Sequence, residues 1–432
     1  MPTKLYLNDD AFEAQFKQFL HLRDEEEADV SKTVRDIIDD VREHGDAALF
    51  RYTEKFDHVT LTPSSMVVDD KRKAEARAAC PDEVKTALTE AAKRIEAYHQ
   101  QQFPSSHSFD DTEGVNLGWR WTPIREVGLY VPGGRASYPS SVLMNAIPAK
   151  VAGCERIAMV VPTPDNEINP AVLVAAEIAG VDEIYTVGGA QAVAALAYGT
   201  QSLKPVHLIV GPGNAYVAEA KRQVFGKVGI DMIAGPSEIM VVADNQNDPR
   251  WIAADLLSQA EHDAMAQSVL ITDDDAFADA VIEAVEELLS ELDREAIARE
   301  SWEKNGGIFV VEKLLDAVPV IDEIAPEHLE LAVEDPDALF DHIHNAGAIF
   351  MGRYTPEAVG DYVAGPSHVL PTSRTARFSS GLSVNDFVKR TSIIGCSREG
   401  LHAIGTHAAN LADSEGLGAH ALSVRLRMQD NQ

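Results

Sequence analysis

The sequence predicts an α/β fold with two Rossmann-like parallel-sheet domains, each incomplete and lacking a G-x-G-x-x-G motif, plus smaller helical terminal segments. Short apolar runs alternate with helical stretches in two series, at 156–224 and 239–311, as in βαβ units. Glycine turns follow two of the apolar runs in the first series. A chain of 432 residues with 45% hydrophobic and 25% charged residues is long enough for several packed cores.

The first third of the chain changes from helical to β-like patterning. Residues 30–99 are amphipathic with helical periodicity and are expected to form covering helices. Val115, Leu117, Trp119 and Trp121 then alternate with polar residues, which is typical of a strand. A second β-like run, 127–131, leads into a glycine turn, so we expect a domain boundary near residue 130.

The first α/β series has strands predicted at 156–161, 183–187 and 207–210, and helices at 170–179, 190–198 and 215–224. Glycine turns at 188–191 and 211–214 lie at carboxyl ends of strands, where open α/β sheets bind ligands. Neither turn matches G-x-G-x-x-G, and glycine also serves ordinary tight turns. These turns alone therefore permit a nucleotide without establishing one.

The second α/β series has strands predicted at 239–242, 268–272, 308–311 and 348–351. Its helices are expected at 251–263 and, as one long helix, from 275 to about 302. Beyond residue 388 we expect helices only. The predicted organisation is an N-terminal arm (1–26), a discontinuous first α/β domain (27–129 and 237–387), a second α/β domain (130–236) and a C-terminal helical segment (388–432).

Charge and cysteine content restrict the partners and the compartment. The formal net charge of −32 disfavours binding to nucleic acid or to an anionic membrane. Three cysteines without C-x-x-C spacing argue against a disulfide framework and a thiolate zinc site. With no secretory signal pattern and no apolar run of about 18 residues, we expect a cytoplasmic protein.

Several polar side chains could bind a metal or transfer protons. Gln259 and His262 are three residues apart in a predicted helix and share one face, although such an isolated pair is most often only a helix end. Glu327 and His328 are adjacent bases, and Asp361 and His420 add a carboxylate and an imidazole. Nitrogen and oxygen ligands of this kind suit zinc or manganese. Spacing cannot choose among the histidines, because His368, His402 and His407 are alternatives.

Eight motifs in this order resemble the histidinol dehydrogenase family over nearly the whole chain. They are Tyr-Val-Pro-Gly-Gly at 130–134, Gly-Gly-Ala-Gln-Ala at 188–192, Gly-Pro-Gly-Asn at 211–214, Ala-Gly-Pro-Ser-Glu at 234–238, Ser-Gln-Ala-Glu-His-Asp at 258–263, Ala-Pro-Glu-His-Leu-Glu at 325–330, Gly-Asp-Tyr-Val-Ala-Gly-Pro-Ser-His-Val-Leu-Pro-Thr at 360–372 and Glu-Gly-Leu-Gly-Ala-His at 415–420. The resemblance implies oxidation of L-histidinol to L-histidine, the last step of histidine biosynthesis. It implies two NAD-dependent hydride transfers through an aldehyde-level intermediate.

The resemblance also implies site residues and a homodimer. One Zn²⁺ per subunit, with Mn²⁺ as a possible substitute, would be bound by Gln259, His262, Asp361 and His420. Glu327 and His328 would be the catalytic acid/base pair. Ser237 and Glu415 would bind substrate together with His328 and the metal ligands, and Tyr130, Gln191 and Asn214 would contact NAD. Glu415 and His420 would reach the active site of the partner subunit.

Three alternatives remain at this stage. One is a related zinc- and NAD-dependent dehydrogenase of another small primary alcohol, such as a sulfonated diol, although a substrate-facing Glu415 would repel a sulfonate. Another is a non-catalytic metal- or nucleotide-binding protein, against which the Glu327-His328 pair argues. The third is a thiohemiacetal mechanism through Cys154, although an isolated cysteine is more often a small buried hydrophobe.

Overall fold

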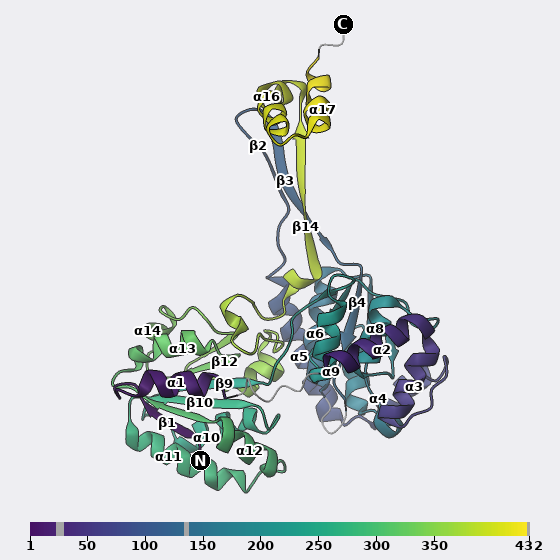
Figure 1. Ribbon diagram of the computed structural model, residues 1–432. Coiled ribbons are helices and arrows are strands. Elements are labelled where there is room, and N and C mark those ends of the chain that lie inside the picture. The colour runs from purple at the N-terminus through teal and green to yellow at the C-terminus, as the bar shows by residue number, and fades with distance from the viewer. Residues whose placement is uncertain (23–29, 134–137, 430–432) are drawn as a thin grey trace.

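The computed structural model describes residues 1–22, 30–133 and 138–429. It contains two parallel sheets in two units that lie side by side, and an antiparallel ribbon that projects from them (Figure 1). The predicted α/β class with parallel sheets is therefore confirmed. None of the helices in the described ranges combines the length and the apolar composition that crossing a membrane requires.

The larger sheet has six parallel strands. Their order is β1 (Thr3–Tyr6), β11 (Gly307–Val310), β10 (Gln267–Thr272), β9 (Glu238–Ala243), β12 (His328–Ala332) and β13 (Ala348–Met351). One face is covered by α10 (Pro249–Ala260), α11 (Asp275–Leu289) and α12 (Glu295–Asn305). The other is covered by α1 (Phe12–Leu20), α13 (Val318–Ile324) and α14 (Pro336–Phe340). Strands β1 and β12 were not predicted, because β1 is short and β12 carries charged residues.

The single long helix expected from 275 to about 302 is wrong, because the chain forms α11 and α12 with a turn between them. Ser290 ends α11, and its hydroxyl donates to the carbonyl of Glu287. The amide of Glu295 then closes the turn on the carbonyl of Leu292. Serine and aspartate favour such local bonds over a continuing helix, and the 290–294 segment contains one of each.

The smaller sheet has five parallel strands in the order β6 (Glu183–Tyr185), β5 (Arg156–Val160), β4 (Glu126–Tyr130), β7 (Leu208–Val210) and β8 (Gly229–Ile230). One face carries α4 (Asp70–Ala79), α5 (Asp82–Gln100), α6 (Pro139–Ala152) and α7 (Pro170–Ile178). The other carries α2 (Ser31–His44), α3 (Asp46–Asp57), α8 (Gly189–Tyr198) and α9 (Ala215–Val224).

The packing corrects the predicted grouping of two segments. The helices between residues 31 and 100 were assigned to the same unit as 237–387, but they cover the five-stranded sheet. Val34, Ile37 and Val41 of α2 are buried in one cluster with Val193 and Leu196 of α8. Residues 1–26 were expected to be a separate arm, yet β1 extends the six-stranded sheet. Amphipathic periodicity shows which face of a helix is buried but not which sheet it covers.

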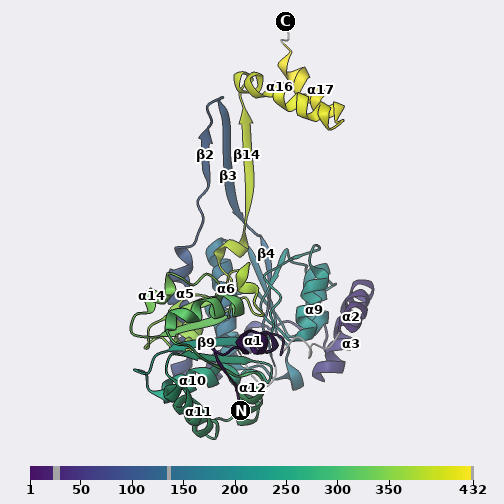
Figure 2. The same cartoon turned by 60° about the vertical axis from the view of Figure 1, so that its left-hand side comes forward.

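The third sheet is an antiparallel ribbon of β2 (His107–Asp110), β3 (Val115–Pro123) and β14 (Val388–Cys396). It rises from the two units and carries α16 (Arg398–Ser414) and α17 (Gly418–Met428) at its tip (Figure 2). The expectation of helices only beyond residue 388 is therefore wrong. Thr391, Ile393 and Ile394 give β14 a β-branched sequence, and each of its nine residues pairs with β3.

Short elements complete the chain. They are the one-turn helix α15 (Glu357–Val359), the π-helix η3 (Gly360–Ala364) and the 3₁₀ helices η1 (Pro164–Asn166), η2 (Leu314–Ala317), η4 (Thr375–Arg377) and η5 (Val384–Phe387). Helix α15 and the π-helix follow strand β13 and lie at the boundary with the other unit. The guanidinium Nε of Arg94 on α5 donates to the carbonyl of Val363 at 2.7 Å.

Candidate active site

The predicted catalytic pair lies at the amino edge of the six-stranded sheet. Strand β12 begins at His328, and its neighbour β9 begins at Glu238. Helix α10 runs back from the carboxyl end of β9, so its C-terminal end, with Gln259, returns to the same edge. The loop after the π-helix lies between this edge and the other unit. His368 on that loop has its Nε2 3.1 Å from the hydroxyl of Ser141 in the other unit.

The imidazole of His328 is buried, and its Nδ1 lies 3.0 Å from the carbonyl oxygen of Glu238 and 3.1 Å from the side-chain nitrogen of Gln259. The carbonyl can only accept, so we assign the proton to Nδ1, which then donates to it. The side-chain amide of Gln259 donates to the same carbonyl at 3.2 Å. The other ring nitrogen, Nε2, lies 3.3 Å from Oδ1 of Asp361 without a well-aligned hydrogen bond. Nε2 is therefore the atom available to accept a proton.

Opposing effects set the basicity of His328. Burial alone would lower its pKa, but the carboxylates of Glu357, Glu327 and Asp361 outweigh burial and hold the pKa well above its usual value. The raised pKa keeps the ring mostly protonated near neutral pH, so the base that takes a proton from an alcohol is the neutral form of His328.

Glu327 is a buried carboxyl group beside this imidazole. Its Oε2 accepts a hydrogen bond from the amide of Glu238 at 2.9 Å. Burial raises the pKa of Glu327 to about 8. The ionised form is therefore a much stronger base than an ordinary glutamate and is matched to activating water near neutral pH.

Gln259, His262 and Asp361, the metal ligands predicted for this edge, offer an amide oxygen, an imidazole and a carboxylate. The nitrogen of the Gln259 amide is used by the Glu238 carbonyl, whereas its Oε1 is buried and has no hydrogen-bond partner among the described residues. Burial lowers the pKa of His262, which favours the neutral imidazole that binds metals. The negative charge of Asp361 acts on His262 as well as on His328. An unsatisfied amide oxygen, a neutral imidazole and a carboxylate fit a zinc or manganese ion.

The sequence analysis missed Glu357. Its side chain is buried, and ligand atoms of His328, Glu357 and Asp361 all lie within 4.8 Å of one another. Burial raises the pKa of Glu357 to about 8. The signal in the sequence was the spacing of four residues between Glu357 and Asp361, which places two carboxylates on one face of a helical segment.

Other predicted residues are divided between this edge and the tip of the ribbon. Ser237 directly precedes β9, and its carbonyl accepts from the amide of Gln267. Glu415 follows α16 and His420 lies in α17, and both helices lie far from β12, the strand that begins at His328 (Figure 1). His402 and His407, both possible ligands by composition, are also on α16. His368 has Nδ1 3.0 Å from the Asp361 carbonyl and Nε2 near Ser141, so both its ring nitrogens are engaged.

The predicted cofactor residues gather at the carboxyl edge of the five-stranded sheet. Tyr130 ends β4, Gln191 lies in the first turn of α8, and Asn214 caps α9. The Tyr130 phenol oxygen accepts from the amide of Gly189 at 3.0 Å, and burial raises the pKa of Tyr130 to about 12, so the phenol keeps its proton. The Gln191 Oε1 is buried without a partner among the described residues. Gly134, the last residue of the 130–134 motif, lies outside the described residues.

Cys154 is not placed to act as a nucleophile. It lies just before β5, at the amino edge of the five-stranded sheet, whereas Tyr130 lies at the carboxyl edge. Burial raises the pKa of its thiol to about 12, so the reactive thiolate is not formed near neutral pH. The structural interpretation of Cys154 is therefore favoured over a thiohemiacetal.

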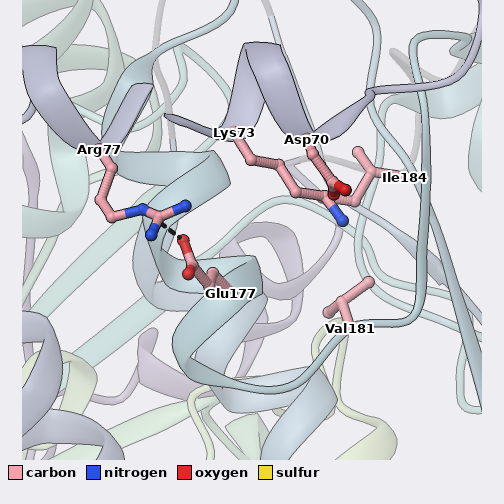
Figure 3. A pocket seen from close by; sticks show the side chains of 6 residues that line it. All are labelled: Asp70, Lys73, Arg77, Glu177, Val181 and Ile184. Carbon is pink, nitrogen blue, oxygen red and sulfur yellow. Dashed lines mark ion pairs between the residues drawn. The ribbon is translucent and has the colours of Figure 1, made fainter. Parts of the chain in front are cut away.

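A cavity of about 260 Å³ lies between α4 and α7, on the outer side of the five-stranded unit (Figure 3). Its lining residues are Asp70, Lys73, Arg77, Glu177, Val181 and Ile184. Arg77 and Glu177 form an ion pair across it at 3.2 Å. None of the predicted site residues lines this cavity.

Comparisons with known proteins identify the family. A family model described as histidinol dehydrogenase matches residues 20–428. A histidinol dehydrogenase of Rhodospirillum rubrum is 60% identical over 429 residues, covering 99% of each chain, and one of Agrobacterium fabrum is 61% identical over 417 residues, covering 96% of each. The crystal structure of histidinol dehydrogenase from Elizabethkingia anophelis matches with a TM-score of 0.93 at 35% identity, covering 99% of this chain and 98% of that one. The chain therefore belongs to the histidinol dehydrogenase family.

Proposed function

We propose that this enzyme oxidises L-histidinol to L-histidine, the last step of histidine biosynthesis, in two successive NAD-dependent hydride transfers through an aldehyde-level intermediate. The observation that carries the proposal is the buried Glu327–His328 pair beside the unsatisfied amide oxygen of Gln259. An imidazole and a carboxylate can each accept a proton, one in each stage of a two-stage oxidation, and the Gln259 oxygen would form part of a metal site.

Each catalytic side chain has one task in this scheme. Nε2 of His328 accepts the proton of the alcohol as hydride leaves the adjacent carbon. In the second stage Glu327 removes a proton from the water that adds to the aldehyde, and hydride leaves the resulting hydrate. The Glu238 backbone holds both residues, because its amide donates to Glu327 and its carbonyl accepts from His328.

The metal residues would be Gln259, His262 and Asp361, completed by His420 of a second copy of the chain. One Zn²⁺ per subunit, replaceable by Mn²⁺, would supply open coordination positions for the imidazole and amine nitrogens of histidinol. Ser237 and Glu415 would also contact substrate, and the Glu415 carboxylate suits a cationic amine. Holding the substrate by its nitrogens would leave its alcohol group free to meet His328.

The cofactor would bind at the carboxyl edge of the five-stranded sheet through Tyr130, Gln191 and Asn214. NAD bound there would accept the hydride in both stages. The unpartnered oxygen of Gln191 and the exposed amide of Asn214 can bind polar groups of a ligand. The protonated phenol of Tyr130 adds a donor.

Stoichiometry tests the proposed reaction. We expect two NADH for each L-histidinol consumed and L-histidine as the product, measured by absorbance and by chromatography in the same reaction. One NADH per substrate with aldehyde accumulation would contradict the two-stage scheme. Turnover of a sulfonated diol but not of histidinol would instead support the other dehydrogenase reaction.

A further inference from the structure

A buried ion pair lies beneath one of the proposed cofactor turns. Lys221 on α9 and Asp231, just after β8, have side chains only 2% and 1% exposed and contact each other directly. The Lys221 ammonium donates to the carbonyl of Gly211 at 2.9 Å. The Oδ2 of Asp231 accepts from the amide of the same glycine at 2.8 Å. The two charges therefore hold both backbone polar groups of Gly211.

Gly211 is a restrictive position in the chain. Its φ of +107° is a conformation that favours glycine, and a Cβ there would lie 2.1 Å from the carbonyl oxygen of Tyr130. The turn from Gly211 is thus pressed against the end of β4. Tyr130 in turn accepts from Gly189 in the turn that leads to Gln191.

The other end of the turn is also fixed. Asn214 caps α9, and its side-chain oxygen accepts from the amides of Tyr216 and Val217. Because Lys221 is on that same helix, its bond to Gly211 closes the turn back onto the helix that follows it. The exposed Asn214 is consequently held between a capped helix and a clamped glycine.

Fold stability alone is a weak explanation for such a pair. Removing two charges from water costs several kcal/mol per ion, and apolar replacements of buried ion pairs are often neutral or stabilising. A charge-assisted hydrogen bond is, however, stronger and more directional than a neutral one. The pair is thus better explained by the backbone geometry that it imposes.

We propose that Lys221 and Asp231 are positioning residues that preorganise the 211–214 turn and Tyr130 for NAD. This inference rests on the proposed function, since it requires NAD to bind at this edge. A turn that is already in its bound geometry loses less conformational entropy on binding, which raises affinity without a new contact.

The test uses double variants, because a single substitution would leave one buried charge unpaired. In K221M/D231L both hydrogen bonds to Gly211 are lost, whereas in K221M/D231N the asparagine oxygen can still accept from the Gly211 amide. We expect the Kd for NAD, from calorimetric titration of the full-length enzyme, to rise about tenfold in the first and less in the second. The KM for histidinol and the kcat at saturating NAD should stay within about twofold of the parent.

Two further variants separate the possible outcomes. R156M/E183Q removes an ion pair at the opposite edge of the same sheet, where Arg156 and Glu183 are 2.8 Å apart, and it should leave NAD affinity unchanged. N214A removes a proposed NAD contact and should weaken NAD binding.

The Kd values for NAD distinguish the outcomes. If both Lys221/Asp231 double variants bind NAD as tightly as the parent while N214A binds it more weakly, the positioning role is overturned and the NAD site stands. An equal loss in R156M/E183Q would overturn it as general destabilisation. If N214A, Q191A and Y130F all bind NAD as tightly as the parent, the proposed NAD site is overturned, and this inference with it.

Discussion

Glu327 and His328 are neighbours in the chain, yet their surroundings give them different chemistry. His328 is held by its Nδ1, which leaves Nε2 as a base whose pKa the nearby carboxylates raise. Glu327 is held by one carboxylate oxygen, and burial raises its pKa to about 8. The shared anchor is the Glu238 backbone, so the register of β9 against β12 sets the position of both groups.

This difference predicts a selective effect of Glu327→Gln. The amide keeps the shape and can still accept from the Glu238 amide, but it cannot take a proton from water. We expect oxidation of the aldehyde to slow by about 10²-fold or more, within the usual range for a lost general base, and oxidation of the alcohol to change far less. Rapid-mixing measurements starting from histidinol or from histidinaldehyde distinguish the two steps. Equal losses in both would show that Glu327 has another role.

The same carboxyl group predicts a pH dependence. A base with a pKa of about 8 is mostly protonated at pH 6, so the aldehyde step should accelerate as pH rises through about 8 and level off only above that value. In Glu327→Gln this rise should disappear from the residual rate. A pH profile of the aldehyde step that is the same in both proteins would contradict the assignment.

A second pair of interacting carboxyl groups lies behind the site: Glu330 of β12 is buried and Asp255 of α10 is half-buried. Burial raises the pKa of Asp255 to about 6. Because the pKa of Asp255 is higher in the folded than in the unfolded protein, this carboxyl group stabilises the folded protein fully below about pH 4, its pKa in the unfolded chain. That stabilisation is lost as pH rises through about 6.

We therefore predict that Asp255→Asn flattens the pH dependence of the free energy of unfolding between pH 4 and 7. Asparagine can still accept from the Glu330 carboxyl but has no charge to bury. Urea denaturation at a fixed protein concentration measures this, and Asp316→Asn, at an exposed carboxylate of η2, serves as the matched control. Parallel curves for the parent and Asp255→Asn would refute the prediction.

At the scale of elements, α10 shows what periodicity can and cannot predict. Its apolar spacing predicted a helix with Gln259 and His262 near its end, and the structure has a helix ending at Ala260. Most strands of both series were placed in the same way from short apolar runs. The missed β12 carries His328 and Glu330 at buried positions, because a strand that contributes to an active site departs from the apolar pattern of a buried strand.

The candidate site itself could not be assembled from spacing. Glu238, Gln259, His328 and Asp361 meet through strand order and the return of a helix, and neither is encoded in local patterning. The family motifs identified these residues where residue-level reasoning left several histidines open. Glu357 was missed by both routes, since it lies outside the quoted motifs and its burial depends on tertiary packing.

If Gln259 and His262, at the end of α10 and just after it, bind a metal, the activity should require that metal. A chelator should abolish histidinol oxidation and added Zn²⁺ should restore it, because Gln259 and His262 would no longer hold the substrate through the metal. His262→Ala should be purified with well under one metal per chain by elemental analysis, whereas His344→Ala, at an exposed histidine, should retain the parent content. Unchanged activity in a verified metal-free protein would refute the metal assignment.

At the scale of the whole molecule, the ribbon and its two helices lack a core of their own. Ile394 on β14 is 74% exposed, and Leu411, Leu422 and Leu426 of α16 and α17 are also largely exposed. Apolar side chains gathered on a projecting segment favour an interface with another molecule. Glu415 and His420 are on this segment, and α16 and α17 lie far from β12, the strand that begins at His328 (Figure 1). A twofold dimer that exchanges the segment would therefore complete both active sites.

This arrangement predicts complementation between two inactive variants. Chains with His262→Ala and chains with His420→Ala are unfolded, mixed in equal amounts and refolded. If the ligands come from two chains, each mixed dimer has one site with both histidines intact and one site lacking both. Random pairing makes half of the dimers mixed, so about a quarter of all sites should be active. Histidinol oxidation by the mixture is compared with each variant refolded alone, and differently tagged chains verify the exchange. If all ligands came from one chain, no pairing could assemble an intact site, so a mixture that stays inactive despite verified exchange would refute the shared active site.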